Sequence, residues 1–316
     1  MGVKAKAAVA IVVLLLFLCS MWLLFFFFTE GSLDYQWDSC LKKYNQINKP
    51  QHRSNSSEAA SYEDRPTLKL CPGFKFQVSV LLAHLLAAPA PTNDVLLQPY
   101  LASWDELIKF MEALGPMVGL ISQEIETKTS IIRELALQEL AESDEGEVGL
   151  AVGKASGNTG HGGGGLERTE ALGAGHAYLS VHSMIQTELS RGLVDFHKTT
   201  ESGCRTLLRL HRALLWLQSF LMKLAERPVD GRLRSPSDLC REAYQNTLAQ
   251  HHSWFVRRAA EIAFIAMPER GFFYRLMCVT NQEEASVVLS RVVQAIGEVY
   301  ERTQGALEVH GMLDLP

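Results

Sequence analysis

The sequence lacks several features that would assign it to a common functional class. Its 316 residues carry a formal net charge of −5, whereas nucleic-acid-binding domains usually carry a broad basic excess, so no nucleic-acid partner is expected. The six cysteines include no C-x-x-C pair of the kind that binds zinc, so no metal site is predicted. Gly153 and Lys154 resemble the end of a phosphate-binding P-loop, but Ala155 stands where that loop needs serine or threonine. No cofactor is therefore predicted.

Catalytic motifs are also missing. His161 and the four glycines after it resemble the oxyanion loop of esterases, but the chain contains no G-x-S-x-G nucleophile elbow. His251 and His252 are adjacent, so a helix would point their side chains about 100° apart, unlike the i, i+4 pair of H-E-x-x-H metalloproteases. We therefore predict that the protein is not an enzyme.

One long apolar run is present, at the N-terminus. In residues 7–28 Ser20 is the only clearly polar residue, and a membrane-spanning helix needs about 20 apolar residues. Lys4 and Lys6 precede this run and acidic residues follow it, so the positive-inside rule predicts that residues 1–29 are a signal anchor and that the rest of the chain is luminal or extracellular. A cleaved signal peptide, which would leave a secreted protein, is the alternative, although no A-x-A-like cleavage site follows the run.

Composition divides the remainder of the chain. Residues 30–74 are polar and predict a tether; within it Asn55 begins an N-S-S sequon, which would be glycosylated only on the luminal side. Residues 75–316 predict one folded domain. Eleven of the 23 glycines lie within about 142–176, so this segment predicts a disordered insert.

Apolar residues recur with helical spacing through most of the predicted domain, and no convincing strand alternation is found. The fold class is therefore predicted to be all-α. The predicted helices cover about 76–88, 100–113, 117–141, 177–198, 205–226, 237–266 with a break near Ser253, 269–277 and 282–308.

The cysteines suggest one pairing. Cys40 and Cys71 flank the polar tether, where a luminal disulfide could close. Cys204, Cys240 and Cys278 fall within helical patterns and are expected to be small buried side chains.

Charged side chains interrupt the apolar faces of two predicted helices. Arg205, Arg209 and Arg212 form one edge of the stretch RTLLRLHRALLWL, and Glu124 and Lys128 interrupt an isoleucine-rich face of the helix over 117–141. A surface ion pair and arginines that reach from a core helix to solvent would explain each helix separately.

A phosphate group would explain both helices together. Residues 205–270 contain eleven Lys and Arg against six Asp and Glu, which indicates a local anion site in a chain that is negative as a whole. A phosphate accepts bidentate bonds from arginine together with a lysine point charge. Two such helices side by side would therefore form a phosphate site beside an apolar interior.

Three segments carry a resemblance to a known family. These are ESGCRTLLRLHRALLWLQSFL at 201–221, HHSWFVRRA at 251–259 and the terminal LDLP. With them, the chain from about 76 to 316, apart from the insert, resembles the glycolipid transfer protein superfamily, in particular its ceramide-1-phosphate transfer branch. The resemblance implies a two-layer α-helical sandwich that takes the lipid chains between its layers and holds the headgroup at the surface.

The resemblance also implies which residues contact the headgroup. Lys128, Arg205 and Arg209 correspond to the three cations that grip the phosphate in this branch. Arg212 has no headgroup role in the resemblance and is expected to be structural, and Trp216 is expected to pack in the core.

Two further contacts are implied near the phosphate. Glu124 stands at the acidic position that recognises the ceramide amide N–H, where the family has aspartate, and His252 corresponds to the histidine that meets the amide carbonyl. Trp254 corresponds to a membrane-facing tryptophan, with an ordinary buried aromatic as the alternative.

The function implied is non-vesicular transfer of a phosphate-headed sphingolipid between membranes. Ceramide 1-phosphate and lipid bilayers are the expected partners, and no protein partner is evident. A membrane-tethered sensor or adaptor that binds the lipid without delivering it is the alternative. Members of the superfamily are soluble in the cytosol, which leaves a cytosolic location open beside the luminal one.

Overall fold

The computed structural model describes residues 70–153, 177–228 and 231–316, and these are almost entirely helical. The helices are α3 (Val78–Ala87), α4 (Leu97–Ala113), α5 (Pro116–Gly153), α7 (Val181–Ser190), α8 (Gly203–Leu224), α9 (Pro236–Asn246), the 3₁₀ helix η1 (Ala249–His251), α10 (Trp254–Ile265), α11 (Arg270–Leu276) and α12 (Gln282–Val309). Within these ranges the β pairing is limited to isolated bridges. The all-α prediction is confirmed.

Serine side chains set the starts of the helices that carry most of the candidate site. Ser202, Ser235 and Ser253 each cap a helix, α8, α9 and α10 respectively, by accepting a backbone N–H three residues further on. Such caps satisfy amide groups that have no partner within the helix. The predicted break near Ser253 is therefore confirmed, and it separates η1 from α10.

Two predicted boundaries are wrong. The helix predicted over 177–198 ends at Ser190, because Gly192 takes a φ of 67°, a left-handed conformation that ends helices and favours glycine. The helix predicted over 117–141 continues as α5 to Gly153, so it extends into the segment predicted as an insert. Residues 154–176 lie outside the described part of the chain.

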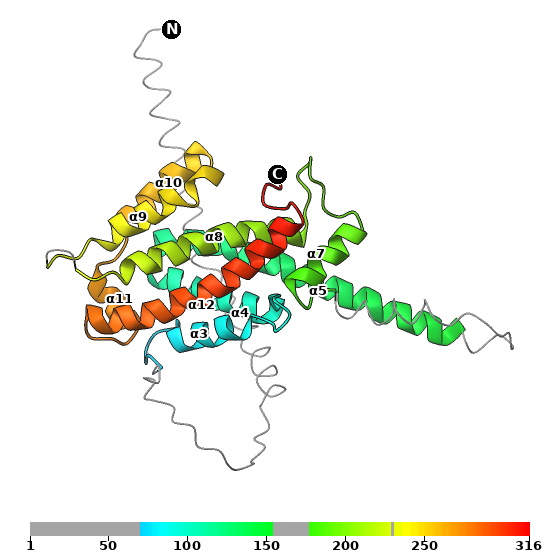
Figure 1. Ribbon diagram of the computed structural model, residues 1–316, viewed down its shortest axis with the longest axis horizontal. Helices are drawn as coiled ribbons and strands as arrows, with labels where there is room; N and C mark the ends of the chain where they lie inside the picture. The colour runs from blue at the N-terminus through cyan, green and yellow to red at the C-terminus, as the bar shows by residue number, and fades with distance from the viewer. Residues whose placement is uncertain (1–69, 154–176, 229–230) are drawn as a thin grey trace, which may run out of the picture. The chain divides into compact units, whose positions relative to one another are not determined.

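The helices pack around a single apolar core. In Figure 1, α8 and α12 lie in front of α4 and α5, in agreement with the layered helical arrangement that the resemblance implies. α8 packs against α5, α9 and α12, and α10 packs against α5 and α9. The core between them includes the fully buried rings of Trp104, Phe220, Phe264 and Phe273.

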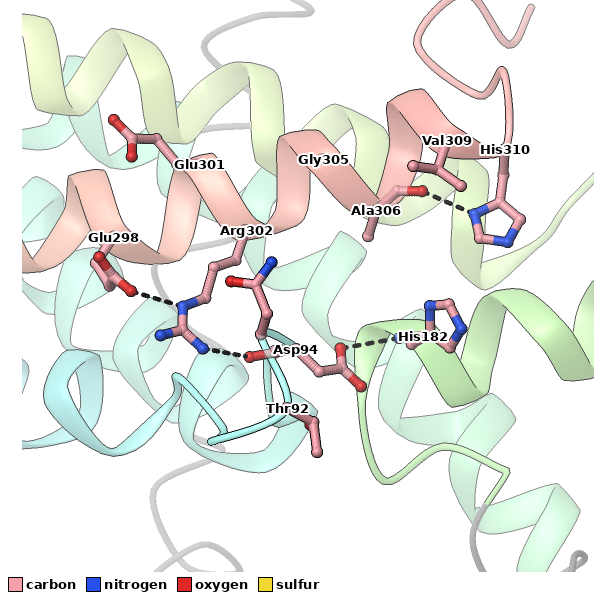
Figure 2. Close-up of a pocket in the computed structure, with 11 residues that line it drawn as sticks. Thr92, Asp94, His182, Glu298, Glu301, Arg302, Gly305, Ala306, Val309 and His310 are labelled. Carbon is pink, nitrogen blue, oxygen red and sulfur yellow. Dashed lines mark hydrogen bonds and ion pairs between the residues drawn. The ribbon is translucent and has the colours of Figure 1, made fainter.

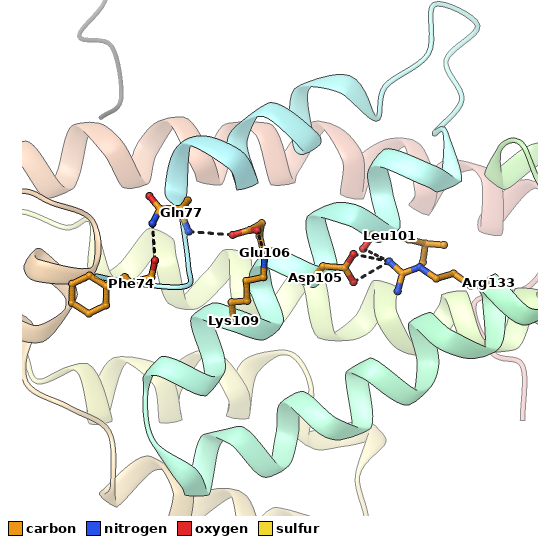
Figure 3. A network of polar contacts seen from close by, with 7 residues as sticks. All are labelled: Phe74, Gln77, Leu101, Asp105, Glu106, Lys109 and Arg133. Atoms are coloured by element: carbon orange, nitrogen blue, oxygen red, sulfur yellow. Dashed lines mark hydrogen bonds and ion pairs between the residues drawn. The ribbon is translucent and has the colours of Figure 1, made fainter. Parts of the chain in front are cut away.

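Polar contacts hold α5 in place relative to α4 (Figure 3). Arg133 on α5 donates to both carboxylate oxygens of Asp105 at 2.8 and 2.9 Å and to the carbonyl oxygen of Leu101. The next residue of α4, Glu106, accepts from the backbone N–H of Gln77, just before α3, and pairs with Lys109. Since α5 also carries Glu124 and Lys128, these contacts help to position the candidate site.

The disulfide differs from the expected one. Cys71 is bonded to Cys278, with their Cα atoms 5.6 Å apart, and not to Cys40, which lies outside the described residues. Cys278 is not within a helix: it follows α11 in a turn with φ 56°, which brings it beside the segment before α3. Cys204 and Cys240 are free and buried, as predicted.

The predictions for the N-terminal segment fall outside the described residues. They concern the span within 1–29, the greater part of the tether and the sequon at Asn55. Among the helices that the structure does describe, none combines the length and apolarity needed to cross a bilayer.

Candidate functional site

The two charged helix faces meet in the structure. α5, which carries Glu124 and Lys128, packs directly against α8, which carries the arginines, and Glu124 lies close enough to act electrostatically on Arg209. Lys128 Nζ lies 2.5 Å from Glu124 Oε1, and the lysine side chain is 20% exposed against 68% for the glutamate. Lys128 is therefore the less exposed member of the pair, and Glu124 lies towards the solvent.

Arg205 and Arg209 are half-buried on α8, one turn apart. Arg205 Nε donates to the backbone oxygen of Pro316, and one of its terminal nitrogens donates to the Thr200 carbonyl at 3.1 Å. Arg209 donates to the Arg205 carbonyl at 3.2 Å. Thr200 and Arg205 supply amide carbonyl oxygens, whereas Pro316, as the last residue, supplies an oxygen of a terminal carboxyl group. Within the described residues no Asp or Glu side chain lies at hydrogen-bond distance from Arg205 or Arg209.

Arg209 lies among other cations. Burial lowers the pKa of its guanidinium, and the positive charges of Arg205 and Arg212 lower it further, while Glu124 acts in the opposite direction. Adjacent cations that are partly removed from water repel one another. An anion bound between α5 and α8 would relieve that repulsion.

His252 joins the cluster from the segment between η1 and α10. Its Nδ1 lies 2.8 Å from the hydroxyl of Tyr244 on α9. Burial lowers the pKa of His252, as does the neighbouring His251, and Glu124 opposes both effects. Glu124 therefore acts electrostatically on both His252 and Arg209.

Trp254 lies at the start of α10 and is 57% exposed, so it is not an ordinary buried aromatic. The guanidinium of Arg258 lies 5.5 Å from the centre of its ring. Phe255, Ile262 and Ile265 on the same helix are also exposed, and they extend the apolar surface beyond the single tryptophan.

Two of the other sequence predictions can be checked directly. Trp216 is 3% exposed and packs in the core, as expected. Arg212 donates to the Leu313 carbonyl at 2.7 Å, a structural role that ties α8 to the end of the chain. Tyr244 was missed, because nothing in the local sequence pattern connects it with a histidine eight residues later.

A separate pocket of about 600 Å³ lies between α12, the start of α7 and the loop that precedes α4. Its lining includes Asp94, His182, Arg302 and His310 (Figure 2). Arg302 is already occupied, since it pairs with Glu298 and donates to backbone carbonyls. In the described ranges no group of three or more His, Cys, Asp and Glu side chains could hold a metal ion. The arginine of this pocket is therefore already paired with a carboxylate side chain.

Comparison with known proteins identifies the fold. The family profile described as "Glycolipid transfer protein (GLTP)" matches residues 95–279. The ceramide-1-phosphate transfer protein of Xenopus laevis is 36% identical over 246 residues, which are 77% of this chain and 97% of that protein. The human protein of the same name is 35% identical over 244 residues, covering 76% and 97% of the two chains.

A solved structure agrees with the sequence comparison. The crystal structure of human ceramide-1-phosphate transfer protein in complex with 12:0 ceramide-1-phosphate is similar, with 34% identity and a TM-score of 0.59, over 75% of this chain and 98% of that one.

Proposed function

The chain belongs to the glycolipid transfer protein family, and from this premise we propose that it transfers a phosphate-headed sphingolipid between membranes, with ceramide 1-phosphate as the substrate. The observation that carries the proposal is the packing of α5, which carries Lys128, against α8, which carries Arg205 and Arg209. No bond is made or broken in such a reaction, so the side chains select and hold the lipid. This family is one of lipid transfer proteins, not of enzymes.

The three cations retain donors for a phosphate. Lys128 has three N–H donors and uses one on Glu124, and Arg205 and Arg209 each keep unused N–H groups beside their bonds to main-chain oxygens. Charge-assisted bonds to phosphate are roughly twice as strong as neutral ones. A phosphate between α5 and α8 would thus add strong bonds without breaking those that hold the arginines.

The ceramide amide would lie next to the phosphate, between an acceptor and a donor. The Glu124 carboxylate accepts the amide N–H, and His252 faces the amide carbonyl. Glu124 affects the pKa of both Arg209 and His252. This supports a location of the ceramide amide between the phosphate and the histidine.

The apolar core supplies the surface for the two lipid chains. The side chains between the helices are closely packed, with rings such as Phe220 and Phe273 in edge contact. We infer that the helices move apart as the chains enter. Burial of about 0.8 kcal/mol per CH₂ group provides the driving force, and the headgroup contacts provide selection.

The exposed apolar face of α10 is the proposed membrane-docking surface. Trp254 combines an apolar ring with a polar N–H, a property that suits the bilayer interface. Phe255 and Ile265 beside it are 77% and 75% exposed. Contact of this face with a bilayer would bring the headgroup cluster close to the lipid surface.

The protein is proposed to act outside the cytosol, anchored by residues 1–29. The Cys71–Cys278 bond supports this location, because disulfides form and persist in oxidising compartments and are rare in the cytosol. The apolar run within 7–28 and the lysines before it also support this location, because the positive-inside rule puts the residues after the run outside the cytosol.

A vesicle-to-vesicle transfer assay tests the proposed function. The Xenopus laevis relative consists almost entirely of the matched region, so we expect residues 66–316 to fold without the N-terminal segment. Catalysed transfer of ceramide 1-phosphate by this fragment is the expected result. Stoichiometric capture without delivery would instead support the tethered sensor or adaptor, and no capture would contradict both.

A further inference from the structure

Tyr244 and His252 form a contact that the sequence pattern did not reveal. Tyr244 lies in the last turn of α9, and its hydroxyl is 2.8 Å from Nδ1 of His252, in the extended residue that follows η1. The contact thus links the end of one helix to the segment that leads into α10, on the side of the headgroup cluster.

The tyrosine ring is held firmly in place. It is 4% exposed and packs against Phe264 of α10, with ring centres 5.3 Å apart. The His252 ring lies 5.6 Å from the tyrosine ring in a tilted arrangement. Packing on two helices therefore fixes the position from which the hydroxyl approaches the histidine.

The contact couples the tautomer of His252 to the direction of the hydrogen bond, since a phenol oxygen can donate its O–H to a bare Nδ1 or accept from Nδ1–H. A phenol hydroxyl has one O–H to donate, and in the described part of the chain Nδ1 of His252 is its hydrogen-bond partner. Donation to Nδ1 requires that nitrogen to be bare. In a neutral imidazole the hydrogen then lies on Nε2, because one ring nitrogen is the donor and the other the acceptor.

We propose that Tyr244 is a positioning residue that fixes His252 as the Nε2–H tautomer, so that His252 donates a hydrogen bond to the carbonyl oxygen of an amide-linked lipid. This inference rests on the proposed function, which places the ceramide amide between Glu124 and His252. Glu124 can only accept while it is ionised and Nε2–H can only donate, so together they match the N–H and the C=O of one amide group. The opposite tautomer would direct a lone pair of Nε2 at the lone pairs of the carbonyl oxygen.

The first test reads the tautomer without any lipid. The fragment 66–316, with ¹⁵N-labelled histidine, is examined by two-bond ¹H–¹⁵N NMR, and the His252 signals are assigned by their loss in His252→Ala. The expected wild-type spectrum shows Nε2 protonated and Nδ1 bare. In Tyr244→Phe, which keeps the ring but removes the hydroxyl, the two tautomers should become mixed. A protonated Nδ1 in the wild type would overturn the inference.

The second test measures binding with vesicles that contain ceramide 1-phosphate. Tyr244→Phe should weaken uptake about fivefold, the usual scale of one net hydrogen bond. In the His252→Ala background the same substitution should have no further effect. Tyr274→Phe is the matched control, because its hydroxyl also makes one hydrogen bond, to Gln282 Oε1 at 2.9 Å, away from the site.

The outcomes separate this inference from the proposed function. An equal loss from Tyr244→Phe with and without His252 would mean that the tyrosine acts only on the fold, and would overturn the positioning role even if phosphate binding is normal. Conversely, a correct tautomer in a protein that takes up no ceramide 1-phosphate would overturn the proposed function and, with it, the assigned acceptor for Nε2–H.

Discussion

Cys71 and Cys278 are joined by a disulfide across 207 residues of sequence, and the bond connects the segment before α3 to the turn after α11. It therefore closes nearly the whole described domain into one loop. Cross-links of long loops restrict the unfolded chain strongly. Cys278 is exposed, whereas Cys71 is buried.

Reduction of this bond should destabilise the domain. For residues 66–316, Cys71→Ser combined with Cys278→Ser should lower the free energy of unfolding by about 2 to 4 kcal/mol, as measured by urea denaturation. Burial raises the pKa of the Cys204 and Cys240 thiols, so alkylation of the folded wild type should label neither. Labelling of Cys71 and Cys278 without prior reduction would show that the bond is absent.

Arg205→Leu and Arg209→Leu should each abolish selective uptake of ceramide 1-phosphate. Each change removes charge-assisted bonds worth about 1.5 to 3 kcal/mol, a loss of at least about tenfold in affinity. Arg232→Leu, at an exposed position, is the matched control and should bind as the wild type does. Thermal unfolding is measured in parallel, because Arg205 also bonds to Thr200. If both variants fold and take up the lipid normally, the phosphate assignment is wrong.

Glu124 should be required for binding of the amide. Glu124→Ala removes the acceptor and leaves an amide N–H without a partner, which costs about 1 to 3 kcal/mol, so the transfer rate should fall about tenfold. Glu124→Asp keeps the carboxylate and restores the residue typical of the family, so it should keep or improve transfer. Wild-type rates from Glu124→Ala would show that this acidic position is not used.

Acid should destabilise the domain through His211. This residue is 2% exposed and bonds Gln304, and burial lowers its pKa from 6.5 to about 4. Between these values the unfolded chain binds more protons than the folded one. The free energy of unfolding should therefore fall as the pH falls from about 6.5 towards 4, by at most about 1.4 kcal/mol per pH unit.

Denaturation at pH 7 and pH 5 measures this effect. His211→Gln keeps a polar side chain near Gln304 but cannot titrate, so its stability should depend less on pH than that of the wild type. An equal pH dependence in the two proteins would assign the effect to other groups.

Asn55→Gln tests the orientation of the full-length chain in cells. If residues 30–74 are luminal, the wild type carries a glycan at Asn55, and the substitution should speed its migration on a gel as glycosidase treatment does. Residues 66–316 should be protected from protease added to intact microsomes. A glycosidase-resistant wild type whose domain is cut by the protease would place that domain in the cytosol.

The sequence by itself determined the helical class of the domain, most helix positions and the family. Helical periodicity and serine caps act over a few residues. The helix break near Ser253 and the leucine stripe of α8 could therefore be predicted from the local sequence. The three cations could also be proposed as a phosphate site, because Arg205 and Arg209 share a helix edge and Lys128 interrupts an apolar face. What the spacing left open was whether these two helices touch.

Only the tertiary structure decided the contacts between distant segments. The pairing of Cys71 with Cys278 depends on where two turns meet in space, and the composition near Cys40 pointed to a different partner. The bond from Tyr244 to His252 depends on how α9 returns toward α10, and the exposure of Trp254 depends on which face of α10 the other helices cover. Such relationships arise from packing of the whole chain, which no local pattern of residues specifies.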